Sequence, residues 1–268
     1  MISLATLGAL CALGSAMTWA VTSLIVRSLI PRFGSVAVNA ARSLLAGGLL
    51  VVWVVATGGL PAMLATPGHV LLMLVVSIVL AIGIGDTAFF ESTRSLGLGR
   101  AMTIATSYPV AAAILAALFL AEPITAPIAT GTLLTLGGLA LVVGARMEPV
   151  AGEPRPGVGV AAAAIAALAW AISIVLVKAP LREVDAVTAQ AIRLPIAGLL
   201  LWATPWSRGA VAAFRASDRA SLSRLAVLSV ITAVSAAMFM VSVKYAGVTV
   251  AAVLSSTAPL FAVPLGIL

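Results

Sequence analysis

Continuously apolar segments of about 20 residues recur along almost the whole sequence, and this recurrence limits the fold more than any other feature. A helix of that length crosses a hydrocarbon core of roughly 30 Å. The strands of a membrane β-barrel would instead alternate apolar and polar residues over about 10 positions. The composition agrees, because 62% of the 268 residues are hydrophobic and 9% are charged. We therefore predict an all-α fold, a polytopic helical bundle in a lipid bilayer.

Charged residues and Pro/Gly clusters divide the sequence into nine predicted spans. The spans cover residues 4–26, 36–57, 70–91, 101–121, 124–146, 158–178, 185–205, 222–244 and 248–268. Segment 148–157, with prolines among charges, is the predicted linker between a first domain, residues 1–147, and a second, residues 158–268. The 15 basic residues are scattered mainly through connections, as in loops between spans, which argues against nucleic-acid binding. High Ala, Gly and Arg usage favours a bacterial inner membrane.

The sequence repeats itself at a nearly constant offset. A shift of 151 residues superposes Trp19 on Trp170, Asn39 on Gln190, Arg42 on Arg193 and Ala46-Gly47 on Ala197-Gly198. A shift of 150 residues superposes Phe89 on Phe239, Gly97 on Gly247 and Pro109 on Pro259. The matches keep their order, so we infer an internal duplication.

Five predicted spans fill the first repeat, and an odd number makes the second repeat enter the membrane from the opposite side. Such inverted repeats build many secondary transporters, in which two halves rock around a site near the midplane. Duplication could also serve only to make a large, stable bundle. The position 150 residues after Glu122 lies beyond Leu268, so the second repeat is expected to lack its fifth helix. Either that tenth helix is missing from this sequence or a partner chain supplies its packing.

Two arginines lie inside predicted spans at equivalent positions of the repeats. Asn39 precedes Arg42 by three residues and Gln190 precedes Arg193 by three, so each pair shares a helical face. Charged groups inside a membrane usually face a cavity or a partner. The two pairs are therefore candidates to line a central cavity and bind carboxylate or phosphate groups. Alternatively, each arginine could extend to the nearer membrane interface.

Asp86 is the acidic candidate in the third span. Its carboxylate could pair with an arginine on another helix, or titrate in proton coupling. The second repeat has Ala236 at the equivalent position, so the acid is not duplicated. The nearby Gly83 and Gly85 favour close helix approach over ligand binding.

Prolines inside the fourth and ninth spans are expected to bend them. Pro109 and Pro259 each leave the carbonyl four residues earlier without its helical hydrogen bond. Such carbonyls, beside Tyr108 and Thr257, could coordinate a substrate, or the kinks could only shape packing. Trp19 and Trp170 lie away from the membrane interfaces, where tryptophan concentrates, and could form cavity walls or simply pack.

Sequence signatures of membrane enzymes are missing. The sequence has no HExxH pattern and no Gly-rich phosphate loop, and His69 is its only histidine. We expect no cofactor or metal and no enzymatic activity. An enzyme acting on a lipid-linked substrate and a non-transporting assembly subunit remain the alternatives to a transporter.

These motifs, in this order, resemble the EamA-type drug/metabolite transporter superfamily. The resemblance covers Trp19-Ala20, Asn39-x-x-Arg42, the Gly97–Pro109 stretch, Ala121-Glu122-Pro123 and the partial repeat after residue 158. It implies ten helices in two inverted repeats and export or exchange of small organic metabolites, either amino acids or drug-like solutes. Carried over by position, the cavity residues are Trp19, Asn39, Arg42, Asp86, Tyr108, Trp170, Gln190, Arg193 and Thr257. The acid that small multidrug relatives carry in their first helix has no match here, so proton coupling is not inherited.

Two arguments on membrane orientation conflict. The loops after spans one, three, five and seven hold ten Lys and Arg residues against three on the other side. The positive-inside rule then predicts an external N-terminus. Members of the EamA-type superfamily, which this sequence resembles, are commonly drawn with a cytoplasmic N-terminus.

Overall fold

The computed structural model describes residues 3–144 and 156–265, and every regular element in these ranges is helical. The first range contains α1 (Leu4–Phe33), α2 (Ser35–Ala56), α3 (Leu60–Leu64), α4 (Gly68–Ile78), the π-helix η1 (Val79–Asp86), α5 (Thr87–Leu96), α6 (Leu98–Ala105), α7 (Tyr108–Leu120) and α8 (Ala126–Gly144). The second contains α9 (Pro156–Lys178), η2 (Pro180–Arg182), α10 (Ala186–Trp202), η3 (Pro205–Ser207), α11 (Ala210–Arg215), α12 (Arg219–Ala246), α13 (Val248–Ser255) and α14 (Ala258–Leu265). The all-α prediction is confirmed for these residues.

Helical segments cover the predicted spans, but α1 ends at Phe33 rather than at residue 26 and the third span at Leu96 rather than at residue 91. Six of them are long and apolar enough to cross a membrane, and α10 with η3 and α11 makes a seventh if that pair, bent by 81°, is one span. The count of nine spans therefore stays a prediction. The predicted linker falls largely on residues 148–155, outside the described residues, and Pro156 already begins α9.

Single glycines make the tightest connections in the bundle. Gly34, Gly97 and Gly247 each have φ between 79° and 89° and separate two helices by one residue. This backbone region is open to glycine without steric cost. The connection between α1 and α2 is thus only Gly34, because α1 continues through Pro31 to Phe33. Gly97 and Gly247 occupy the same place in the two repeats.

Both spans that contain a predicted bending proline are interrupted just before it, while the bend itself stays a prediction. The fourth span is divided into α6 and α7 at Thr106-Ser107, and the ninth into α13 and α14 at Ser256-Thr257. Pro109 and Pro259 lie just after these breaks, where a missing N–H leaves no helical bond unmade. The equal offset of the two breaks shows that the duplication extends to backbone geometry.

The third span is continuous but contains the π-helix η1 at its centre, between α4 and α5. π-Helical turns are rare in proteins, and those that occur often lie at functional sites. A Cβ added to Gly85 would come within 2.6 Å of the indole of Trp170, whereas one added to Gly83 would meet only a Val79 methyl group at 3.7 Å. Of the two glycines, therefore, Gly85 allows the close approach that the sequence predicted.

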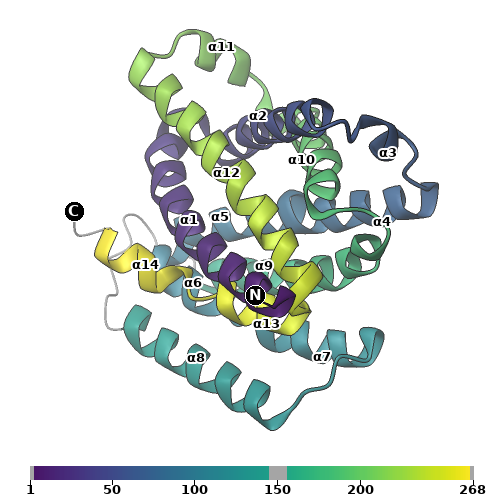
Figure 1. The fold of residues 1–268 in the computed structure, drawn as a ribbon. Helices are drawn as coiled ribbons and strands as arrows, with labels where there is room; N and C mark the ends of the chain where they lie inside the picture. Colours follow the sequence, from purple (N-terminus) through teal and green to yellow (C-terminus); the bar gives the residue numbers. More distant parts are fainter. Residues whose placement is uncertain (1–2, 145–155, 266–268) are drawn as a thin grey trace.

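Contacts between the repeats come in matching pairs, as a twofold relation between them requires. The helices α2 and α10, which are equivalent in the two repeats, pack against each other. The first helix of one repeat packs against the third span of the other, namely α1 against α12 and α9 against α4, η1 and α5. Figure 1 shows α1 and α12 running side by side, with α8 at the edge of the bundle. The core therefore lies between the repeats.

Large apolar side chains also cover the outside of the bundle. Leu118, Phe119, Leu134 and Trp53 are among the exposed ones. An apolar exterior of this extent suits lipid rather than water, in agreement with the membrane helices.

Candidate functional site

A central cavity of about 200 Å³ lies between the repeats. Its walls come from α1, α2, the third span, α6, α7, α9, α10 and α12 to α14, and no described residue of α8 lines it. The lining residues are Ser15, Trp19, Arg42, Ile78, Ala81, Ile82, Asp86, Phe89, Met102, Ala105, Thr106, Tyr108, Trp170, Ser173, Ile174, Val177, Gln190, Arg193, Leu194, Thr232, Ser235, Ala236, Phe239, Met240, Ser255, Ser256 and Ala258.

Much of this wall is itself duplicated. Residues at matching repeat positions that both line the cavity are Trp19 and Trp170, Arg42 and Arg193, Ile82 and Thr232, Asp86 and Ala236, Phe89 and Phe239, Ala105 and Ser255, Thr106 and Ser256, and Tyr108 and Ala258. The two halves of the chain thus build one cavity from equivalent surfaces.

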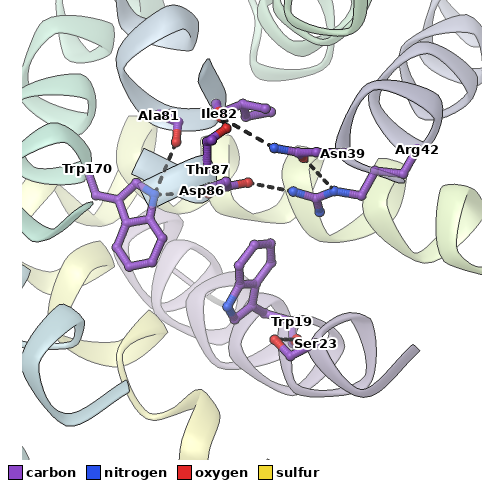
Figure 2. Close-up of polar contacts among 9 residues, drawn as sticks. All are labelled: Trp19, Ser23, Asn39, Arg42, Ala81, Ile82, Asp86, Thr87 and Trp170. Atoms are coloured by element: carbon purple, nitrogen blue, oxygen red, sulfur yellow. Dashed lines mark hydrogen bonds and ion pairs between the residues drawn. The ribbon is translucent and has the colours of Figure 1, made fainter. Parts of the chain in front are cut away.

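Arg42 lies at one side of the cavity in a polar cluster (Figure 2). Its Nη2 donates to Asp86 Oδ2 at 2.5 Å and its Nε donates to Asn39 Oδ1 at 2.9 Å. The Trp19 ring lies 5.3 Å from the guanidinium carbon, a cation–π distance. With 1% of its surface exposed, Arg42 is turned into the bundle rather than towards a membrane interface.

Asp86 links the two repeats at the end of η1. Its Oδ1 accepts from the Trp170 indole N–H at 3.0 Å while its Oδ2 accepts from Arg42. Trp170 also approaches the Ala81 carbonyl at 3.2 Å, one turn earlier in η1 (Figure 2). Of the two roles open to Asp86 in the sequence, the structure supplies the ion pair.

Arg193 lies at the equivalent position of the second repeat but has neutral neighbours. Its Nε donates to Ser77 Oγ at 3.1 Å and its Nη1 to Gln190 Oε1 at 3.0 Å. Nη2 approaches Ser173 Oγ at 3.4 Å, and that hydroxyl donates to the Ser77 carbonyl at 2.6 Å. The Arg193 side chain is 2% exposed.

Aromatic rings form another part of the wall. Trp170 packs against Phe89 and Tyr108, with ring centroids 5.4 Å and 5.9 Å apart. The Tyr108 hydroxyl donates to the Ala252 carbonyl of α13 at 3.1 Å. Since Tyr108 and Ala252 belong to different repeats, this bond joins the two broken spans.

The profile of the EamA-like transporter family matches residues 6–144 and again residues 157–268. The chain belongs to the EamA-like transporter family. A solved structure titled "Crystal structure of protein" has the same fold, with a TM-score of 0.75 over 97% of this chain and 87% of that chain at 18% identity. No curated protein matches the sequence.

The cavity of this EamA-like transporter brings together seven of the sequence-predicted site residues. They are Trp19, Arg42, Asp86, Tyr108, Trp170, Gln190 and Arg193. Asn39 is buried behind the wall, where it holds Arg42 and donates to the Ile82 carbonyl at 3.3 Å. Pro109 and Pro259 are buried but do not line the cavity, and the Thr257 hydroxyl bonds to the Leu254 carbonyl. Ser256 and Ala258 line the cavity in place of the predicted Thr257 and Pro259.

Sequence reasoning missed the serines that hold Arg193. Ser77 and Ser173 are common small residues in apolar helices, and nothing in their spacing separates a ligand of Arg193 from a packing residue. It also missed the role of Glu122. This carboxylate accepts from the backbone N–H groups of Val248 and Thr249 at 3.0 Å and 3.3 Å, so it caps the N-terminus of α13 across the repeat boundary.

Proposed function

We propose that this EamA-like transporter exports or exchanges small organic metabolites across a bacterial inner membrane by alternating access through the central cavity. The single observation that carries the proposal is the duplicated cavity wall, to which both repeats contribute residues at matching positions. Two equivalent halves around one site provide two equivalent gates, which alternating access requires.

Helix breaks support a conformational change of this kind. The α6–α7 and α13–α14 breaks lie at the cavity wall and at the same place in each repeat. Broken helices place backbone groups beside a cavity at membrane depth, as in other transporters. The bonds from Trp170 to Asp86 and from Tyr108 to Ala252 then become contacts that a rocking motion makes and releases.

The cavity size favours metabolites over larger drug-like solutes. Pockets for drug-sized ligands measure roughly 300–1,000 Å³, and this cavity has about 200 Å³. Small metabolites, of about the size of an amino acid, are therefore the preferred class.

Transport is tested with the purified chain in proteoliposomes. A panel of labelled metabolites is offered with an outward gradient, with an inward gradient and against unlabelled internal solute, which separates export, uptake and exchange. We expect saturable flux of at least one metabolite and none in protein-free liposomes. No flux in any of these arrangements, combined with turnover of a lipid-linked substrate in detergent without a gradient, would contradict the proposal and favour the membrane-enzyme alternative.

A further inference from the structure

The two cavity arginines differ in one decisive respect, which is the presence of a counterion. Arg42 is paired with Asp86, and Arg193 has no acidic partner among the described residues. The other described acids are engaged elsewhere: Glu91 with Arg94, Glu122 at the start of α13, Glu183 with His69, Asp185 at the start of α10 and Asp218 with Arg32. Within the part of the chain that the structure describes, the cavity therefore has one uncompensated positive charge.

Arg193 also retains hydrogen-bonding capacity. A guanidinium has five N–H donors in a planar fork that matches a carboxylate. Of its four neighbours, the Met240 thioether is a weak acceptor and the Ser173 hydroxyl lies at 3.4 Å. Among the described residues, only Ser77 and Gln190 offer Arg193 an oxygen acceptor at ordinary distance. The donors at the end of the fork are thus poorly satisfied.

A buried cation without a partner is costly, and an anion that enters its site recovers part of that cost. We propose that Arg193 binds the carboxylate of the transported solute. The inference rests on the proposed function and adds a substrate class to it: a small organic monoanion with an apolar or aromatic body. One carboxylate balances the positive charge of Arg193. A neutral solute would leave this charge unbalanced, and a cationic solute would add a second positive charge.

Other parts of the cavity wall fit the remainder of such a solute. Ile174, Val177, Leu194 and Phe239 line the cavity with it and offer an apolar surface. Thr232 also lines the cavity and is 6% exposed, and its hydroxyl has no hydrogen-bond partner in residues 3–144 and 156–265. A buried hydroxyl without a partner calls for an explanation, and a polar group of the bound solute would supply one.

Binding to the purified chain in chloride-free detergent buffer tests the inference, with three probes of one shape. They are 3-phenylpropanoate, 3-phenylpropanamide and 3-phenylpropylamine, and thermal stabilisation reports their affinities. We expect the carboxylate to bind at least about tenfold more tightly than either analogue, the effect of one charge-assisted hydrogen bond. Equal binding of the three probes, or none, would overturn the inference.

Variants locate the charge preference at Arg193. Arg193→Gln is expected to abolish it and Arg193→Lys to retain part of it. Arg94→Gln, which replaces an exposed arginine outside the cavity, should bind like the wild type. A carboxylate preference that persists in Arg193→Gln would contradict carboxylate binding by Arg193. If Arg193→Gln does not fold, Arg193→Lys decides instead, and complete loss of the preference in that variant would contradict the inference.

The same measurements separate this inference from the proposed function. Selective carboxylate binding with no flux of any solute would refute transport and leave the Arg193 site standing. Flux of neutral solutes without carboxylate binding would refute the Arg193 site and leave transport standing.

Discussion

At the scale of single residues, the cavity combines an arginine that is paired with an acid, Arg42, with an arginine that has no acidic partner among the described residues, Arg193. Arg42 and Arg193 descend from the same position of a duplicated unit and keep the same polar neighbour three residues earlier. Asp86, present in one repeat and replaced by Ala236 in the other, gives them different electrostatic environments. A duplicated helix has thus become two different parts of one site.

The Arg42–Asp86 pair is expected to follow the energetics of buried ion pairs. Arg42→Gln leaves the Asp86 carboxylate without its cation, and breaking such a pair costs about 3–5 kcal/mol. Adding Asp86→Asn should recover a large part of that loss, because the uncompensated charge disappears. Thermal unfolding in detergent of the two single variants and the double variant measures this coupling. Simple additivity of the two losses would show that the pair is not coupled.

At the scale of helices, small residues decide how closely α2 and α10 approach. Gly47 and Gly198 hold matching positions at this crossing. A Cβ on Gly198 would lie 2.7 Å from the Leu44 nitrogen, and a Cβ on Gly47 would overlap the Pro195 ring. The duplicated Ala-Gly pairs of the sequence are thus explained by close backbone contact at the centre of the bundle.

Neighbouring glycines in α2 provide a matched test of this packing. Gly47→Ala inserts a methyl group into a filled contact and should destabilise the protein by about 1–3 kcal/mol. Gly48→Ala points into open space and should be neutral or stabilise by up to about 1 kcal/mol, since alanine is the better helix former. Equal unfolding temperatures for the two variants would count against the close contact.

The start of α12 should show a pH dependence of its own. Asp218 caps this helix through Ser221, and this hydrogen bonding, chiefly from the Ser221 side chain and aided by Arg32, lowers the pKa of the Asp218 carboxyl. A lowered pKa means that the stabilisation is complete above the ordinary value of about 3.9 and is lost as the pH falls through the folded-state value. Compared with Asp218→Asn, a cap without charge, the wild type should lose its advantage in unfolding temperature below that pH. A pH-independent difference would contradict this role.

At the scale of the whole molecule, two repeats share one cavity, and polar bonds join them around it. Ser15 of α1 and Ser235 of α12 line the cavity from opposite repeats, with their hydroxyl oxygens 3.4 Å apart. A covalent bond at this place would fix the repeats relative to each other.

A reversible cross-link tests whether the repeats move. Cys11 is the only cysteine, so Cys11→Ser gives a background for Ser15→Cys with Ser235→Cys. Oxidation of the pair is expected to abolish flux in proteoliposomes and reduction to restore it, with either single cysteine variant unaffected by oxidation. Full flux through the oxidised pair would exclude relative motion of α1 and α12 as a requirement for transport.

The sequence by itself determined the membrane-helical class, the duplication, the positions of the proline breaks and most of the polar residues that meet in the cavity. Each of these features depends on composition or on the order of residues along the chain, and the amino-acid sequence contains both. Only the tertiary structure decided which arginine Asp86 neutralises, that Ser77 and Ser173 hold the other, and that Thr257 lies outside the wall. In spans that are apolar on every face, periodicity does not distinguish inward from outward positions. Those pairings depend instead on how helices cross, and residues as far apart as Asp86 and Trp170 meet only after the repeats have packed.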